Sequence, residues 1–188
     1  MNTAEHLSMS ELEAGLDEIK KSPADRGILK MIVCRPEVDK RKILEQGELD
    51  PESGLVGDNW KTRGSSRTND GFGHPEMQLN IMNSRAISLI GGSEERWKLA
   101  GDQLFIDLNL SDENLPVGSR LKIGDAIVEV TAIPHNGCKK FTERFGIDAV
   151  KFVNSPIGKE LHLRGINAKV IQAGTISAGD CVKKISKL

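Results

Sequence analysis

Residues 134–146, PHNGCKKFTERFG, place one cysteine at the start of a short basic stretch. His135 precedes Cys138 by three residues, and Lys139 and Lys140 follow it directly. A thiol at a helix N-terminus beside cations has a lowered pKa, which favours the reactive thiolate. The sequence therefore predicts that Cys138 is a nucleophilic, oxidisable or metal-binding sulfur, with its two lysines in catalytic roles.

A short helix over residues 138–145 would position this cysteine. Phe141 and Phe145 are four residues apart and would form the buried stripe of such a helix. Gly146 has the residue type that ends a helix with a positive φ. Arg144 lies within two turns of Cys138, so the helix would carry an anion-attracting charge near the sulfur.

The neighbours of Cys138 allow two interpretations each. His135 could be a proton donor or a group that orients the thiol, or its ring could lie in solvent at a turn. Lys139, Lys140 and Arg144 could lower the pKa of the sulfur and attract an anion, or they could form one solvated helix face.

The other two cysteines have different surroundings. Cys34 ends an apolar run and Cys181 opens a predicted last strand, so both are expected to be buried. Three distant cysteines give neither a disulfide framework nor a zinc-binding CxxC pair. The sequence therefore indicates a reducing compartment.

Residues 61–76, KTRGSSRTNDGFGHPE, have no apolar period and are predicted to form a long mobile loop. Arg63 and Arg67 could hold a phosphate there, in a loop that closes over the site, or the loop could be a solvated surface. No GxxxxGK[ST] or GxGxxG pattern marks a nucleotide site. Arg120 and Arg164 could line an anion pocket, or they could form ion pairs with nearby acids.

The remaining elements are mostly short strands. A capping box at Ser8 and Glu11 begins a predicted helix over residues 8–21. Runs of β type follow, and Gly124 and Asp125 form a hairpin turn between two of them. The runs cover residues 28–33, 78–82, 104–108, 120–123, 126–132 and 168–173, and helices are predicted at residues 84–90, 94–99 and 148–153. The pattern indicates a mainly β fold, an antiparallel β-barrel or sandwich with short peripheral α-helices and an N-terminal helix.

Length and charge restrict the function further. The chain has 188 residues, which suits a helical extension over residues 1–26 and a single domain over residues 27–188. The net charge of −1 gives no general electrostatic case for nucleic acid, so no nucleic-acid partner is expected. No segment resembles a signal peptide or a membrane span, so we expect no membrane partner and a soluble cytoplasmic protein.

Several segments in order resemble the MOSC domain, named for the C-terminal domain of molybdenum cofactor sulfurase. They are GLVGDNW at residues 54–60, QLNIMN at 78–83, the ENLPVG-containing stretch at 100–131, PHNGCKKFTERFG at 134–146, and LRGINAKVIQAGTISAGD at 163–180. The likeness covers about residues 27–186 and is greatest to small stand-alone bacterial members. After the GLxGD element many relatives have a basic residue and a histidine, whereas this chain has Asn59 and Trp60. His74 or His135 would be the nearest substitutes by type.

The resemblance implies a β-barrel and a cysteine, here Cys138, that carries sulfane sulfur or ligates molybdenum. Larger relatives join this domain to a pyridoxal-phosphate cysteine desulfurase domain, and others bind the molybdenum cofactor and reduce N-hydroxylated compounds. The sequence contains no desulfurase domain, so a separate cysteine desulfurase is the expected sulfur donor, and molybdenum-cofactor enzymes are possible partners.

The residues and the resemblance together favour an enzyme that carries sulfur or binds the molybdenum cofactor, with Cys138 as the persulfide-forming or metal-ligating sulfur. The alternatives are a module that binds a small anion or a partner protein without turnover, and a molybdenum-dependent reductase. The cofactor could equally be absent from the isolated protein. Five arginines are expected to bind a cofactor anion: Arg63, Arg67, Arg120, Arg144 and Arg164.

Overall fold

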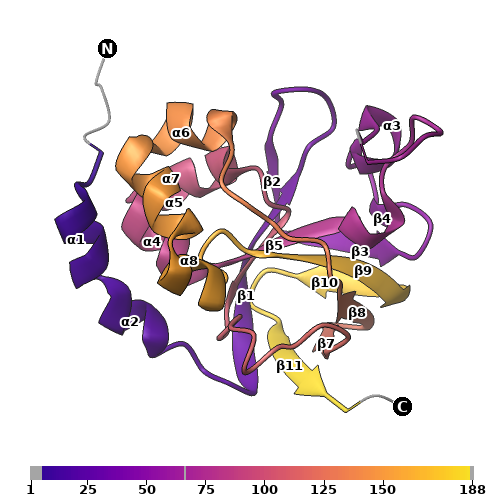
Figure 1. The fold of residues 1–188 in the computed structure, drawn as a ribbon. Helices are drawn as coiled ribbons and strands as arrows, with labels where there is room; N and C mark the ends of the chain where they lie inside the picture. Colours follow the sequence, from indigo (N-terminus) through magenta and orange to yellow (C-terminus); the bar gives the residue numbers. More distant parts are fainter. Residues whose placement is uncertain (1–5, 66, 187–188) are drawn as a thin grey trace.

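Seven strands close into a barrel (Figure 1). The computed structural model describes residues 6–65 and 67–186. The barrel order is β11-β7-β8-β9-β5-β6-β1, and a β11–β1 pairing closes it. The strands are β1 (Arg26–Cys34), β5 (Leu79–Asn83), β6 (Leu104–Asp107), β7 (Arg120–Ile123), β8 (Ala126–Val130), β9 (Ile166–Gln172) and β11 (Cys181–Ile185). The predicted β-barrel is confirmed.

One pair of barrel strands departs from the predicted antiparallel arrangement. β5 and β6 run parallel, whereas the other neighbouring pairs in the barrel are antiparallel. A parallel pair requires a crossover connection, and here the chain crosses through helices. These helices are α4 (Ser84–Gly91), α5 (Glu94–Trp97) and the 3₁₀ helix η2 (Lys98–Ala100).

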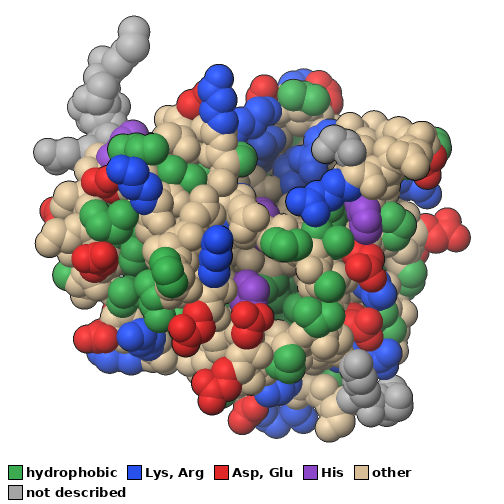
Figure 2. All heavy atoms as spheres, viewed as in Figure 1, with side chains coloured by type: hydrophobic (Ala, Val, Ile, Leu, Met, Phe, Trp, Pro, Cys, Tyr) green, Lys and Arg blue, Asp and Glu red, His purple; other side chains and the backbone are tan. Residues whose placement is uncertain are grey.

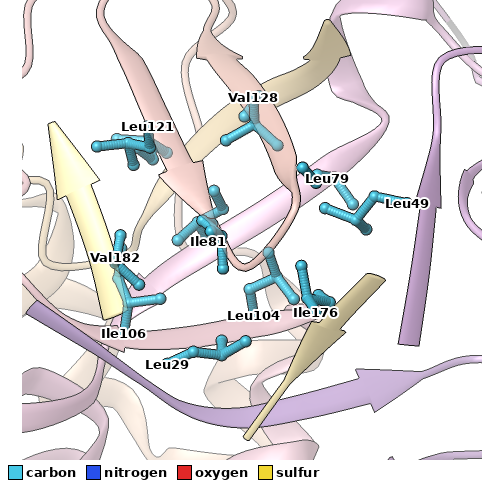
Figure 3. Packing of buried hydrophobic residues seen from close by; sticks show 14 of the residues in the cluster. Leu29, Leu49, Leu79, Ile81, Leu104, Ile106, Leu121, Val128, Ile176 and Val182 are labelled. Carbon is cyan, nitrogen blue, oxygen red and sulfur yellow. The ribbon is translucent and has the colours of Figure 1, made fainter. Parts of the chain in front are cut away.

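A small second sheet covers part of the barrel interior. It contains β10 (Gly174–Ser177), β3 (Gln46–Asp50) and β4 (Gly54–Leu55), and β2 (Lys42–Leu44) extends the edge of β1. Leu49 and Ile176 of this sheet pack into the same apolar cluster as Leu79 and Leu104 of the barrel (Figure 3). The small sheet therefore shares the apolar core of the barrel.

The strands that touch the helices are buried on both faces. In β5, Leu79 and Ile81 point into the barrel, while Met82 packs in a second apolar cluster with the helices. In β6, Leu104 likewise points into the barrel, and Phe105 packs in the cluster with the helices. This alternation follows from the two-residue period of a strand, and it explains why these segments have almost no exposed positions.

Most helices gather on one side of the barrel, whereas α3 (Trp60–Arg63) lies on the other side, beside β4 (Figure 1). The remaining helices are α1 (Met9–Ala14), α2 (Leu16–Lys20), η1 (Pro75–Met77), α6 (Lys139–Phe145), α7 (Ile147–Asn154) and α8 (Pro156–Glu160). The Ser8 capping box is confirmed, although Gly15 divides the predicted N-terminal helix into α1 and α2. Leu12 of α1 is buried in the helical cluster. No helix within the described residues has the length and apolarity needed to cross a membrane.

Candidate functional site

The cysteine at the start of α6 is accessible to solvent. Cys138 is the N-cap residue of α6 and has an exposed side chain. Phe141 and Phe145 are buried, and Gly146, with φ of +91°, ends the helix as predicted. Cys34 is buried, and burial followed by the nearby Asp58 charge raises the pKa of its thiol. The prediction that Cys181 is buried is wrong, because its position on β11 faces solvent.

Backbone contacts fix Cys138 while its side chain remains free. The Gly137 N–H donates to Asn154 Oδ1 at 2.9 Å, and Asn154 Nδ2 donates to Gly137 O at 3.2 Å. A Cβ on Gly137 would lie 2.7 Å from Val150 Cγ2, so this backbone rests directly on α7. Thr142 N donates to Cys138 O at 3.0 Å. The residue before the cysteine and the first turn after it are therefore both held.

Two of the basic residues on α6 face the segment that follows β1. Lys140 Nζ lies 3.4 Å from Asp39 Oδ1, and an Arg144 guanidinium nitrogen lies 3.7 Å from the same oxygen. Arg144 also donates to Leu99 O at 2.7 Å. Lys139 is exposed. α6 thus has the exposed cysteine at its start, and two of its basic side chains, Lys140 and Arg144, lie near Asp39.

Four arginines from separate parts of the chain form an arginine cluster: Arg35, Arg41, Arg63 and Arg144. Burial, and then the charges of Arg144 and Arg35, lower the pKa of Arg41. Burial and then Arg35 lower the pKa of Arg63, although its side chain keeps much of its surface in solvent. We attribute this combination to a concave surface that crowds the guanidinium without covering it. Figure 2 shows Lys and Arg side chains around a hollow on this face.

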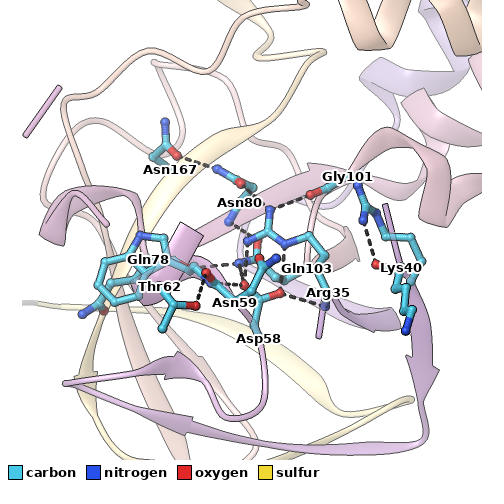
Figure 4. A network of polar contacts seen from close by, with 12 residues as sticks. Arg35, Lys40, Asp58, Asn59, Thr62, Gln78, Asn80, Gly101, Gln103 and Asn167 are labelled. Carbon is cyan, nitrogen blue, oxygen red and sulfur yellow. Dashed lines mark hydrogen bonds and ion pairs between the residues drawn. The ribbon is translucent and has the colours of Figure 1, made fainter. Parts of the chain in front are cut away.

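A buried ion pair with Asp58 holds Arg35, one member of the arginine cluster, in place (Figure 4). Arg35 binds Asp58 through two side-chain bonds, Nε to Oδ2 at 2.9 Å and an NH2 contact to Oδ1 at 2.8 Å. The two side chains are 3% and 0% exposed. Trp60 N also donates to Asp58 Oδ1 at 2.9 Å, so this carboxylate fixes the start of α3. The acid of the GLVGD element therefore has a positioning role.

A chain of buried amides connects this ion pair to the segment that carries His135. Arg35 donates to Asn80 Oδ1 at 3.3 Å, and Asn80 Nδ2 donates to Asn167 Oδ1 at 2.6 Å (Figure 4). Asn167 Nδ2 then donates to Ile133 O at 2.9 Å. Sequence reasoning missed these residues, although a polar residue inside an apolar strand, as at Asn80, is a signal that could have found them.

Arg164 lies in a second buried ion pair. It donates to Asp102 Oδ2 at 2.7 Å and to Ala100 O at 2.9 Å, and its guanidinium carbon lies 4.9 Å from the Phe141 ring centroid. Burial raises the pKa of Asp102, although the charge of Arg164 opposes this effect. The guanidinium at 2.7 Å favours the ionised form of this carboxylate. The charge of Arg164 is therefore committed to Asp102.

His135 lies against this second pair. Its Nδ1 is 3.5 Å from Asp102 Oδ1, and its side chain is 14% exposed, so the interpretation of a ring in solvent is wrong. Burial, followed by the charges of Arg164 and Arg35, lowers the pKa of His135 well below its ordinary value. His135 is consequently neutral at physiological pH.

One turn ties three of these arginines together. The carbonyls of Leu99, Ala100 and Gly101 accept hydrogen bonds from Arg144, Arg164 and Arg35, respectively. The first two carbonyls end η2, where helix geometry leaves carbonyl groups without intrahelical donors. The turn therefore holds arginines from the segment after β1, from α6 and from the segment before β9 at fixed positions.

Two predicted cofactor ligands lie outside this group. Arg67 is exposed, and its backbone N–H donates to Ser65 Oγ at 3.1 Å. Arg120 pairs with Glu129 at 3.0 Å, and its strand β7 lies at the opposite end of the molecule from α6 (Figure 1). The structure therefore brings Arg63 and Arg144 into the arginine cluster, pairs Arg164 with the buried Asp102, and places Arg120 far from the cluster.

The segment over residues 61–76 has more structure than its composition predicted. It overlaps α3 at its start and contains η1 near its end. Thr68 Oγ1 donates to Phe72 O at 2.6 Å, and Gly73 N donates to Lys61 O at 3.1 Å. Its closure over a ligand stays a prediction.

Residues 74–183 match the family model of the MOSC domain. The chain belongs to the MOSC domain family. No curated protein matches it in sequence. Within the described part of this MOSC protein, no group of three or more His, Cys, Asp or Glu side chains could hold a metal ion.

Solved structures share the fold of this MOSC protein. The YuaD protein from Bacillus subtilis has a TM-score of 0.64 at 17% identity, over 87% of this chain and 97% of that one. YiiM from Escherichia coli has a TM-score of 0.54 at 19% identity, over 86% and 71%. YiiM from Geobacillus stearothermophilus has a TM-score of 0.55 at 12% identity, over 85% and 75%. At these identities the likeness establishes the fold alone.

Proposed function

We propose that this MOSC protein binds the molybdenum cofactor and supplies Cys138 as a thiolate ligand. One observation carries the proposal. The exposed Cys138 begins the same helix whose Arg144 belongs to the arginine cluster. A soft sulfur ligand and a site for an anion are the two features that a phosphate-bearing, metal-carrying pterin requires.

The charges of the arginine cluster fit such a ligand. Asp58 pairs with Arg35, and Asp39 pairs with Arg144. No acid lies within ion-pair distance of Arg41 or Arg63 among the described residues. The Nε of Arg41 is also buried without a hydrogen-bond partner in this part of the chain. A phosphate would supply the missing acceptor and the missing negative charge.

Each residue then has a defined part. Arg41 and Arg63 bind the phosphate, and Arg35 keeps the site in place through Asp58. Cys138 presents its sulfur from a backbone that Asn154 holds. The bound cofactor supplies the redox chemistry of molybdenum.

Sulfur carriage is a second candidate, which the exposure of the Cys138 side chain favours. In this case the Cys138 thiolate attacks the terminal sulfur of a persulfide on a cysteine desulfurase. A new S–S bond forms on Cys138, the S–S bond of the donor breaks, and the donor cysteine leaves as a thiolate. The transfer needs no external oxidant or reductant.

Elemental and pterin analysis of protein expressed in a host that makes the cofactor tests the first candidate. We expect molybdenum and pterin with the parent protein, loss of molybdenum in Cys138→Ser, and loss of both in Arg41→Ala. Arg120→Ala is the matched control, since Arg120 lies far from the site, and it should retain both. Cys138→Ser should keep its free energy of unfolding within about 1 kcal/mol of the parent value. Equal molybdenum in the parent and Cys138→Ser would exclude the thiolate ligand.

Intact mass after incubation with a cysteine desulfurase and cysteine tests the second candidate. The expected result is an added sulfur atom on the parent protein and none on Cys138→Ser. If the parent protein holds neither molybdenum, pterin nor an added sulfur atom, both candidates fail and the anion-binding module becomes the better interpretation.

A further inference from the structure

A separate cavity of about 320 Å³ opens beside His135. Asn136, Lys159, His162 and Arg164 are among its lining residues. A smaller cavity of about 140 Å³ adjoins it and shares His135 and His162. Neither cavity is lined by Cys138 or by the arginine cluster. The larger volume is within the usual range for small-molecule sites, so this cavity is a candidate ligand site in its own right.

The surroundings of His135 determine which ring nitrogen carries the proton. Nδ1 is buried and lies 3.5 Å from Asp102 Oδ1, and Arg164, 2.7 Å from the other oxygen, favours the ionised carboxylate. A lone pair on Nδ1 would face the negative oxygen, so the favoured tautomer has its hydrogen there. Nε2 is then a hydrogen-bond acceptor. Unlike Nδ1, Nε2 is not one of the buried side-chain atoms that lack a hydrogen-bond partner in the described part of the chain. The accessible part of the ring lines the cavity.

Hydrogen-bond donors also line this cavity. Arg164 Nε is buried and has no hydrogen-bond partner among the described residues. Lys159 is exposed at the cavity, and within the described chain no acid lies in ion-pair distance of it. The nearby Asp112 carboxylate is 2.7 Å from His162 Nε2, so it has a hydrogen-bond partner. The cavity therefore offers an anion the Lys159 ammonium and the unused Nε–H of Arg164, whose charge is paired with Asp102, and it offers one acceptor at His135 for a donor group.

We propose that this cavity is a second ligand site, for small carboxylates that carry a hydroxyl or ammonium group on the adjacent carbon. The carboxylate accepts hydrogen bonds from Arg164 Nε and Lys159, and the O–H or N–H of the ligand donates to His135 Nε2. Asp102 positions the ring by fixing the tautomer. This site does not depend on the proposed function, because neither Cys138 nor molybdenum takes part.

The charges that face His135 agree with its role as an acceptor. Asp102 lies 3.5 Å from the ring, and Arg164 and Arg35 lie close enough to act on it electrostatically. The same cavity is also lined by His162, Asp112 and Lys159. Burial and the two arginines lower the pKa of His135, so the ring stays neutral at physiological pH.

Titration with glycolate, glycine and acetate tests the site, with the ring signals of the four histidines followed by NMR at neutral pH and low salt. We expect glycolate and glycine to shift the His135 signal with saturation. Acetate lacks the donor group and should bind roughly two- to tenfold more weakly, as the loss of one hydrogen bond implies. Equal affinity for glycolate and acetate, or no saturable shift with glycolate, would overturn the proposal.

Variants assign the contacts. Lys159→Ala should weaken glycolate binding roughly two- to fivefold, the range of an exposed ion pair. Lys151→Ala on α7 is the matched control, because it removes an exposed lysine that does not line the cavity, and it should bind as the parent does. His135→Phe should remove the preference for glycolate over acetate. If His135→Phe does not fold, the comparison of Lys159→Ala with Lys151→Ala still tests the site. Equal weakening of glycolate binding in these two variants would overturn the proposal.

Cys138→Ser separates this site from the proposed function. It should bind glycolate with the affinity of the parent, even though it cannot ligate molybdenum or carry sulfur. Loss of glycolate binding in Cys138→Ser would show that the ligand occupies the Cys138 site instead, and it would overturn the assignment of a second site.

Discussion

Replacement of Asp58 by asparagine removes the support beneath the arginine cluster. The Asp58 carboxylate accepts hydrogen bonds from Arg35 N, Nε and NH2, from Trp60 N, and from Gln103 Nε2 at 3.4 Å. Asparagine has nearly the same shape but only one acceptor oxygen, and its NH2 group would face some of these donors. Arg35, 3% exposed, would remain buried without its counter-charge.

The size of this effect follows from the burial of the pair. Removal of one partner from a buried ion pair costs roughly 3–5 kcal/mol, because the other charge stays desolvated. A domain of this size has only about 5–15 kcal/mol of stability, so Asp58→Asn should lose a large share of it. Asp39→Asn is the matched control. Asp39 is 65% exposed and pairs with Lys140 and Arg144, so its removal should cost about 0–1 kcal/mol.

Urea unfolding at neutral pH, followed by circular dichroism, measures both variants against the parent. Since the slope with urea reports the surface exposed on unfolding, an unchanged slope identifies a true change in stability. If Asp58→Asn and Asp39→Asn lose equal free energy, the buried pair does not support the arginine cluster and the argument fails. If Asp58→Asn gives no cooperative transition, Arg35→Lys serves instead: it keeps the charge but loses the paired geometry, and it should still cost more than Asp39→Asn.

Three further predictions concern the segment around the site. Iodoacetamide should modify Cys138 fastest and the buried Cys34 slowest, as followed by peptide mapping, and faster modification of Cys34 would contradict the site assignment. Gly137→Ala should cost roughly 1–3 kcal/mol in urea unfolding, because its Cβ meets Val150 Cγ2 at 2.7 Å; an unchanged midpoint would show that the backbone moves freely. The pKa of His135 is lowered by folding, so the unfolded chain binds a proton that the folded chain does not, and stability falls as pH drops below about 6.5. His135→Gln should remove up to about 1.4 kcal/mol per pH unit of this acid dependence, and an identical pH profile would contradict the burial of the ring.

Local patterns predicted the elements that a few neighbouring residues determine. The spacing of Phe141 and Phe145 with Gly146 predicted α6, and Gly124 with Asp125 predicted the β7–β8 hairpin. In each case the decisive interactions are close in sequence, namely helix-face packing, a helix end and a two-residue turn. The exposure of Cys138 was predicted for the same reason, since its polar neighbours are adjacent to it.

Local patterns failed where distant segments decide the environment. Cys181 was expected in the core because it begins a strand, but only strand pairing determines which positions face inward. One interpretation placed the His135 ring in solvent, yet the ring is buried beside Asp102 and under the electrostatic influence of Arg164, both from distant segments of the chain. The parallel β5–β6 pair likewise depends on the path of the crossover helices.

The sequence by itself determined the family resemblance, the mainly β class and the cysteine at the start of a basic helix. Only the tertiary structure decided which arginines share a surface. Arg35 and Arg41 drew no attention in the sequence, because a charge has no visible partner until distant segments meet, whereas Arg120 looked equivalent and lies far away. Electrostatic interactions depend on distance and burial, and both are properties of the folded chain, so the candidate site could be predicted at Cys138 but not around it.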